Sequence, residues 1–226
     1  MLPIEVEAIP GFREPVSSLS HLLAIPFFLV AGYFLIRKGR GSLGRTVSLA
    51  IMAASTVALL TVSTIYHIQD EQTTARYVFW QLDMAGIFVL IAGTVTPVHM
   101  ILFRGFHRWV PIALIWLAAA VGITLRNLYA EELMTASDAL FVLMGWGGSY
   151  SCIILWKRYG FPFVRPLLIG GLAYTLGVVC ITWRNWPDLV PGVVDGHALW
   201  HFATLIGLAF HWKFVFQFAQ GRPAEA

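Results

Sequence analysis

The sequence predicts an all-α, polytopic membrane protein whose residues 1–226 form a single domain, a bundle of seven transmembrane helices. Composition is the first reason: of 226 residues, 58% are hydrophobic and only 12% are charged, whereas a soluble domain carries roughly 25% charged residues. The second reason is the mean hydropathy of the chain, which is +0.73. The third is a series of seven apolar windows, each close to the length of about 20 residues that a helix needs to cross a bilayer.

Short polar segments separate the seven expected spans, which cover residues 19–36, 46–67, 76–98, 109–125, 138–156, 164–183 and 197–218. Glycine, proline or charged residues bound each span, as in RKGRGSLGR (37–45) and KRYGFPFVR (157–165). No linker or low-complexity segment separates a second domain. The first 18 residues contain three glutamates and lack the basic start of a signal peptide. We therefore expect the first span to remain in the mature protein.

Basic residues are distributed unequally between the two ends of the predicted bundle. On the side of the N-terminus lie Arg13, Arg76, Arg126 and Arg184. The other side has the remaining eleven of the 15 basic residues, which are Arg37, Lys38, Arg40, Arg45, Arg104, Arg108, Lys157, Arg158, Arg165, Lys213 and Arg222. The positive-inside rule then places the C-terminus in the cytoplasm and the N-terminus outside. This bias also accounts for the pI near 9.0, so we predict no nucleic-acid partner.

Polar side chains within the spans gather at the N-terminal side of the membrane. The second span runs toward that side and ends in STIYH, which contains Ser63 and His67. The third span carries Asp83 about two turns after its start, and the seventh span opens with His197 and His201. Ionisable residues are rare inside membrane spans and usually have a function there. The sequence thus predicts a functional site at this side of the membrane.

The spacing of these residues indicates a metal site. His197 and His201 are four residues apart, so both imidazoles share one helix face, as in the zinc-peptidase motif. Together with His67 they offer three nitrogen ligands, and three protein ligands with one open position are typical of a catalytic Zn²⁺ site. Asp83 would orient a ligand imidazole or take a proton from the bound water. Ser63 would hydrogen-bond the same water or a substrate carbonyl.

Two other interpretations of the histidines remain open. They could be packing residues that hydrogen-bond main-chain carbonyls or an aspartate of another helix. A haem with two axial histidines is a weaker interpretation, because ligands four residues apart chelate one ion instead.

The remaining polar candidates have less specific spacing. His211 lies ten residues after the paired histidines, about 15 Å deeper along the helix, so we expect it to pack or relay protons rather than bind metal. Glu14 and His21 lie at the start of the first span, at the same side as the histidine pair, and their roles are left open. His99 and His107 flank the loop after the third span and are expected to be solvated.

Five segments carry a resemblance to a known family. They are LDMAGIFVLIAGTVTPV (82–98), GGLAYTLGVVCITWRN (170–185), HALWHFATLIGLAFH (197–211), STIYH (63–67) and REPVSSLSH (13–21). In order and spacing they resemble the haemolysin III family, the bacterial branch of the progestin and adiponectin receptor family. The resemblance covers about residues 12–218, and the motifs are highly specific in combination.

The resemblance implies a seven-helix fold with Zn²⁺ near one membrane face, bound by His67, His197 and His201. Asp83 would hold the zinc-bound water, with Ser63 beside it. Haemolysin III proteins commonly have a histidine directly after this aspartate, and here that residue is Met84. We expect the zinc site to be kept because Asp83 is kept, whereas a proton relay through position 84 would be affected.

The resemblance also suggests an activity, because the wider superfamily includes alkaline ceramidases, which cleave a lipid amide. We expect a zinc-dependent intramembrane hydrolase of a lipid amide or ester, in the inner (cell) membrane of a bacterium, with membrane lipids as environment and substrate. One alternative is a lipid-homeostasis or signalling sensor with a structural zinc, which would show a fourth protein ligand. Another is a haemolysin-like cytolysin or channel, which would need a continuous polar pore. The sequence is also compatible with a homo-oligomer.

Overall fold

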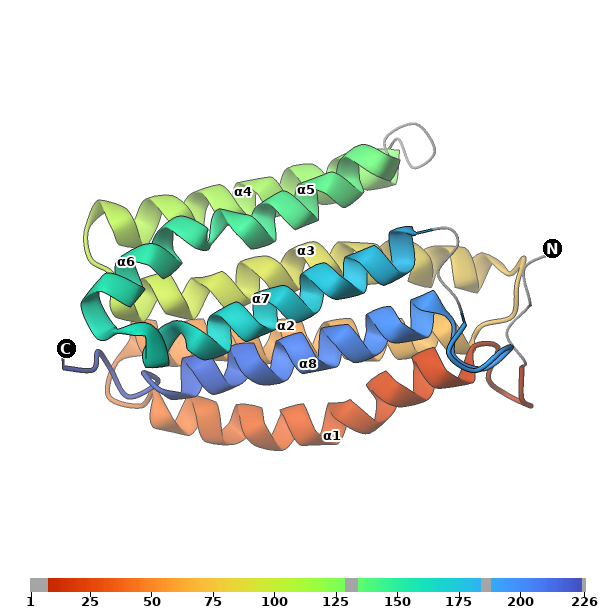
Figure 1. Cartoon of the computed structure of the whole chain (residues 1–226), viewed down its shortest axis with the longest axis horizontal. Helices are drawn as coiled ribbons and strands as arrows, with labels where there is room; N and C mark the ends of the chain where they lie inside the picture. The colour runs from red at the N-terminus through yellow and green to blue at the C-terminus, as the bar shows by residue number, and fades with distance from the viewer. Residues whose placement is uncertain (1–7, 129–133, 184–187, 225–226) are drawn as a thin grey trace.

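The computed structural model describes residues 8–128, 134–183 and 188–224, and it is a bundle of helices that run along one common axis (Figure 1). The helices are α1 (Pro15–Lys38), α2 (Leu43–Ile68), α3 (Thr74–Leu102), α4 (Phe106–Leu128), α5 (Met134–Gly147), α6 (Ser149–Tyr159), α7 (Phe161–Thr182) and α8 (Gly196–Phe216). Seven segments are long and apolar enough to cross a membrane, and α5 and α6 together provide the fifth, Ala139–Tyr159. The predicted all-α fold with seven spans is confirmed.

The fifth span differs from the prediction, because it is divided into two helices. Gly148 separates α5 from α6, and Gly147 precedes it. Two adjacent glycines lack the side chains that stabilise a helix turn, and such pairs are common sites of helix bending. In Figure 1, α6 turns away from the direction of α5 toward the start of α7.

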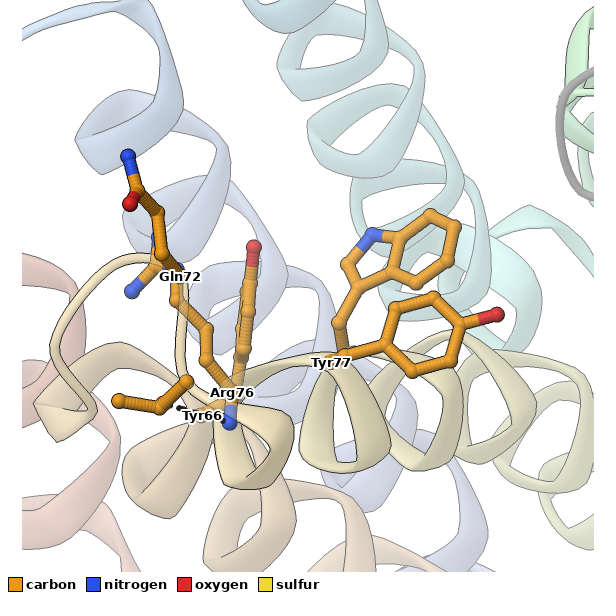
Figure 2. Close-up of a pocket in the computed structure, with 6 residues that line it drawn as sticks. Tyr66, Gln72, Arg76 and Tyr77 are labelled. Atoms are coloured by element: carbon orange, nitrogen blue, oxygen red, sulfur yellow. Dashed lines mark hydrogen bonds between the residues drawn. The ribbon is translucent and has the colours of Figure 1, made fainter.

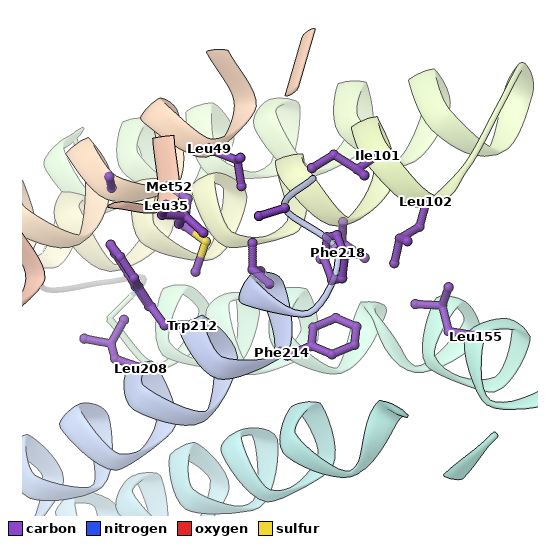
Figure 3. Close-up of a cluster of buried hydrophobic side chains, with 14 of the residues drawn as sticks. Leu35, Leu49, Met52, Ile101, Leu102, Leu155, Leu208, Trp212, Phe214 and Phe218 are labelled. Atoms are coloured by element: carbon purple, nitrogen blue, oxygen red, sulfur yellow. The ribbon is translucent and has the colours of Figure 1, made fainter. Parts of the chain in front are cut away.

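The main apolar core lies toward the end of the bundle that carries the C-terminus. Figure 3 shows side chains of α1, α2, α3 and α8 meeting there, together with the segment that follows α8. Leu35, Leu49 and Leu208 are fully buried, as is Phe218, which comes after the end of α8. The chain beyond α8 therefore folds back onto the bundle and closes this end with apolar side chains.

Many large apolar side chains point outward, among them Leu23, Phe27 and Leu176, each more than half exposed. In a bilayer this surface meets lipid, and the helical main chain satisfies its own hydrogen bonds. The outward apolar surface and the seven spans identify an integral, multi-pass membrane protein.

The expectation that His99 is solvated is wrong. His99 is 3% exposed, and its Nδ1 lies 2.8 Å from the main-chain carbonyl oxygen of His107. Its Nε2 lies 3.1 Å from the Ser151 hydroxyl. His99 thus connects α3 to the start of α4 and to α6. Both ring nitrogens have hydrogen-bond partners, so burial of the ring leaves no polar atom unsatisfied.

Candidate metal centre

The structure brings His67, His197 and His201 together at the end of the bundle opposite the apolar core. His67 lies in the last turn of α2, and the other two lie in the first turns of α8. One ring nitrogen from each of the three lies within 4.8 Å of the others. The ring centres of His67 and His201 are 4.6 Å apart, and those of His67 and His197 are 5.0 Å apart. Three imidazoles from two helices therefore surround one point.

Two nitrogens of this cluster lack the partners that buried polar atoms normally have. The Nε2 atoms of His67 and His201 are buried and accept or donate no hydrogen bond within the described chain. Leaving a buried polar atom unsatisfied costs about 1–3 kcal/mol. A cation shared by the three rings would satisfy both nitrogens, and imidazole is a ligand that suits zinc and several other transition metals. The donor set thus fits a metal ion.

Glu14 determines which nitrogen His67 presents to the cluster. The Nδ1 of His67 lies 2.7 Å from Oε2 of Glu14 and donates to it, which leaves the Nε2 lone pair free to face the other histidines. Oε1 of Glu14 accepts a 2.5 Å hydrogen bond from Arg76, and the main-chain N–H of Glu14 donates to the carbonyl of His67. A carboxylate on the outer nitrogen of a ligand histidine is common at zinc sites, where it fixes the ring and raises its basicity.

The carboxyl group of Glu14 is ionised at neutral pH. Burial raises its pKa, but the hydrogen bonds from His67 and Arg76 more than offset that effect and lower the pKa to about 2. Glu14 therefore supplies a full negative charge beside the histidine cluster.

His21 contacts the outer nitrogen of His201, as Glu14 contacts the outer nitrogen of His67. The Nε2 of His21, on α1, lies 3.0 Å from the Nδ1 of His201, and both rings are buried. One of these two nitrogens carries the proton that the other accepts. If the Nδ1 of His201 donates, its Nε2 faces the cluster as a lone pair. Thus Glu14, the residue directly before α1, is the partner of His67, and His21 within α1 is the partner of His201.

Asp195 fixes the start of α8 and therefore the position of the histidine pair. Its carboxylate accepts a 2.8 Å hydrogen bond from the main-chain N–H of Ala198, which makes it the N-cap of the helix. Because His197 and His201 lie within the first two turns, their direction depends on where the helix begins.

Asp83 and Ser63 lie next to each other on α3 and α2, and both side chains are buried. Asp83 does not belong to the group of potential metal ligands found in the described chain. This placement leaves its carboxylate beside the cluster rather than inside the ligand set. Met84, which follows it, is half-buried.

His211 lies away from the cluster on α8. Its ring packs 5.3 Å from the ring of Tyr174 and against the backbone of Gly170. This location agrees with the expectation that it is not a ligand.

A small surface pocket lies at the same end of the bundle as the histidine cluster. It measures about 300 Å³ and is lined by residues of α2, α3 and the loop between them: Tyr66, Gln72, Thr73, Arg76, Tyr77 and Trp80. Figure 2 shows Arg76 beside the ring of Tyr66, and the guanidinium carbon is 4.7 Å from the ring centre. Arg76 therefore connects this pocket to Glu14. The sequence contains no signal for this contact, because Arg76 and Glu14 are 62 residues apart.

The fold and the site together define a seven-helix integral membrane protein with a three-histidine cluster at one end. The family described as Haemolysin-III related matches residues 11–212, and the chain belongs to that family.

Curated relatives agree with this assignment. The chain is 28% identical over 201 residues to Hemolysin-3 of Bacillus cereus, which covers 87% of each chain. It is 26% identical over 199 residues to the Hemolysin-3 homolog of Bacillus subtilis (strain 168), covering 87% of this chain and 90% of the relative. It is also 28% identical over 153 residues to the heptahelical transmembrane protein ADIPOR2 of Oryza sativa subsp. japonica, covering 61% and 66%. The last similarity connects the chain to the progestin and adiponectin receptor superfamily.

Proposed function

We propose that the protein is a zinc-dependent intramembrane hydrolase that cleaves an amide or ester bond of a membrane lipid. The observation on which the proposal rests is the pair of buried Nε2 atoms of His67 and His201, which have no hydrogen-bond partner in the described chain and face a third histidine. Structural zinc sites are closed by four protein ligands, whereas catalytic sites keep one position open. A group of three candidate ligands among the described residues supports the catalytic alternative.

The residues around the cluster suit hydrolysis. Bound zinc would supply a Lewis acid that polarises a carbonyl group and lowers the pKa of a water molecule. His67, His197 and His201 would hold the ion, while Glu14 and His21 keep the rings of His67 and His201 oriented through their outer nitrogens. Because Glu14 and His21 orient the ligand rings, Asp83 is not needed for that role. Asp83 would instead accept a proton from the attacking water and return it to the leaving group. Ser63, beside it, would hydrogen-bond the water or the substrate carbonyl.

The surroundings suit a lipid substrate. The acyl chain would lie along the apolar outer surface of the helices, where many large side chains point outward. The polar part of the lipid would enter near the small pocket that contains Arg76, Tyr66 and Tyr77. We place the protein in the bacterial inner membrane with its N-terminus and histidine cluster on the outer side, because most basic residues lie at the opposite end.

Metal content of the purified protein, wild type beside His201→Ala, is the first test. We expect about one zinc per chain in the wild type and loss of the metal in the variant, because His201 contributes one of three ligands. Elemental mass spectrometry on protein purified without chelators measures it. Absence of metal from the wild-type protein would refute the proposal that it is a zinc-dependent hydrolase.

Hydrolysis itself is tested with short-chain ceramides and phospholipid esters presented in mixed micelles. Asp83→Asn should keep the zinc and lose at least about 100-fold in rate, the lower end of what general acid–base catalysis contributes. His211→Ala, at a half-buried position of α8 away from the cluster, should keep both the metal and the activity if the protein folds. If Asp83→Asn keeps its activity, or if both variants lose activity equally, the role assigned to Asp83 is contradicted.

The name of the Bacillus relatives raises a cytolysin or channel as an alternative. The apolar core argues against a pore, because buried leucine and phenylalanine side chains fill the end of the bundle opposite the histidines (Figure 3). Release of a trapped dye from vesicles by the wild type and equally by His201→Ala would favour the cytolysin. We expect no release from either.

A further inference from the structure

The end of the bundle opposite the histidines contains a second and larger pocket, which the proposed function does not use. It has a volume of about 530 Å³. Its walls come from the start of α2, the end of α3, the start of α4 and the segment after α8. Three stretches that are distant in sequence, residues 42–45, 100–109 and 221–222, thus meet around one hollow at this end of the bundle.

Four arginines line this pocket: Arg45, Arg104, Arg108 and Arg222. No carboxylate is among the residues that line it within the described chain. By position in the sequence, every aspartate and glutamate except Glu225 belongs to the N-terminal segment, to the histidine half of a span or to a loop at the histidine end. Among the described residues, no carboxylate of the lining therefore neutralises the positive charge of the pocket.

The arginines are held in place by the main chain rather than by acids. Arg45, Arg108 and Arg222 each donate one hydrogen bond to a backbone carbonyl, at 3.2, 3.0 and 3.0 Å. The Nε of Arg45 and one terminal nitrogen of Arg222 are buried without a hydrogen-bond partner in the described chain. Burial, followed by the charge of Arg104, lowers the pKa of Arg222, with further contributions of the same sign from Arg108 and Arg158. An anion in the pocket would relieve both the repulsion and the unmet hydrogen bonds.

The positive-inside bias alone does not explain this arrangement. It requires basic residues on one side of the membrane, but not their convergence around a hollow. Arg37, on the same side, instead points along α1 and donates to the Tyr33 hydroxyl. Phosphate is one of the anions whose geometry matches the paired N–H donors of a planar guanidinium group.

The other walls of the pocket indicate a lipid rather than a soluble phosphate. Met100 and Trp109 contribute apolar surface, and Trp109 is exposed at the start of α4, where tryptophan is typical of the membrane interface. The neighbouring Leu43 and Phe106 are also strongly exposed. Basic pockets between transmembrane helices are known to take anionic lipid headgroups. We propose that this pocket binds the phosphate-bearing headgroup of an anionic phospholipid.

Binding of dioctanoyl phosphatidylglycerol to the full chain in a non-ionic detergent tests the proposal by isothermal titration calorimetry. The wild type should bind this lipid at least about tenfold more tightly than dioctanoyl phosphatidylcholine, whose positive choline group cancels its charge. The double variant Arg104→Gln/Arg222→Gln should lose at least about tenfold in affinity, since two charge-assisted contacts are removed. Inorganic phosphate at the same concentration should not displace the lipid.

The matched control is Arg37→Gln/Arg40→Gln, which removes the same charge from the same end but outside the pocket. Its affinity should stay within about twofold of the wild type, because exposed charges act only weakly through screened solvent. Equal loss in the two double variants, or equal binding of the two lipids, would overturn the proposal. Displacement by inorganic phosphate would assign the pocket to a soluble phosphate compound instead.

Folding of the double variant is checked by its Tm and by its metal content, which should both match the wild type. If the double variant does not fold, Arg104→Gln alone serves, because this side chain is exposed. It should weaken binding about threefold or more, a modest value for one charge-assisted contact. Unchanged affinity in a folded Arg104→Gln protein would refute the proposal.

Discussion

At the scale of single residues, the site depends on two partners that lie far from it in the sequence. Glu14 bonds the outer nitrogen of His67, and His21 bonds the outer nitrogen of His201. An imidazole has two nitrogens, and the partner of one decides whether the other carries a lone pair or a proton. The N-cap residue and the second turn of α1 therefore set the protonation state of ligand candidates on α2 and α8.

Substitution of Glu14 by glutamine tests this dependence. Glutamine keeps the shape of the side chain but removes the negative charge that favours an N–H on Nδ1 of His67, so zinc affinity should fall by about 10–100-fold. Competition with a chromophoric chelator measures the affinity. Glu71→Gln is the matched control, because Glu71 is an exposed acid at the same end, paired with Arg13 at 2.6 Å. Equal affinity in the two variants would show that Glu14 does not support the site.

The sequence predicted the histidine group but not its supporting contacts, and the reason is physical. His197 and His201 share a helix face by their spacing, and His67 reaches the same end because α2 ends and α8 begins there. Glu14 lies 53 residues from His67, and His21 lies 180 residues from His201. Local periodicity does not determine which helices become neighbours, so the roles of Glu14 and His21 required the fold.

At the scale of elements, close approach of α7 and α8 depends on glycines. A Cβ at Gly170 would lie 2.6 Å from the His211 ring and 3.0 Å from the carbonyl oxygen of Gly207. A Cβ at Gly207 would lie 2.6 Å from the ring of Tyr174. Small residues at such interfaces let two membrane helices pack closely, because lipid provides little hydrophobic driving force between them.

Gly170→Ala and Gly171→Ala form a matched pair for this interface. Alanine at 170 overpacks the contact with α8 and should lower the free energy of unfolding by about 1–3 kcal/mol. Alanine at 171 meets no atom within 4 Å and should leave stability unchanged or raise it, because alanine favours helix. Thermal unfolding in detergent measures both. Similar Tm values for the two variants would contradict the close contact.

The helices themselves were largely predictable, because apolar length is a strong signal when loops are short. Each of the seven windows corresponds to a span in the structure. The division of the fifth span at Gly148 was missed, since hydropathy is averaged over a whole span and does not report local bending of a helix. The burial of His99 was missed for a related reason: its partners, Ser151 and the His107 carbonyl, come from other helices.

At the scale of the whole molecule, metal would connect helices that are distant in the chain. His67 is on α2, and His197 and His201 are on α8, so an ion shared by them binds only the folded bundle. With free zinc at 100 times its Kd, the stabilisation is about 2.7 kcal/mol. For a chain of this size we expect removal of zinc by a chelator to lower the Tm by roughly 5–10 °C, from about 2–4 °C per kcal/mol.

His201→Ala is the control for metal removal. Its Tm should not respond to zinc or to chelator, because two histidines hold the ion much more weakly than three. An equal response of the variant and the wild type would mean that zinc stabilises the protein elsewhere.

The charge asymmetry finally predicts how the molecule lies in the membrane. Cysteines at Asp70 and Arg40, exposed positions at opposite ends of the bundle, are introduced after both native cysteines have been replaced by serine. A membrane-impermeant maleimide added to intact cells should label Asp70→Cys but not Arg40→Cys, which should react only after permeabilisation, because basic loops remain in the cytoplasm. That result would place the histidines where zinc arrives from outside and the arginine pocket in the leaflet rich in anionic lipid. The reverse pattern would exchange the two environments and require the histidine site to take its metal from the cytoplasm.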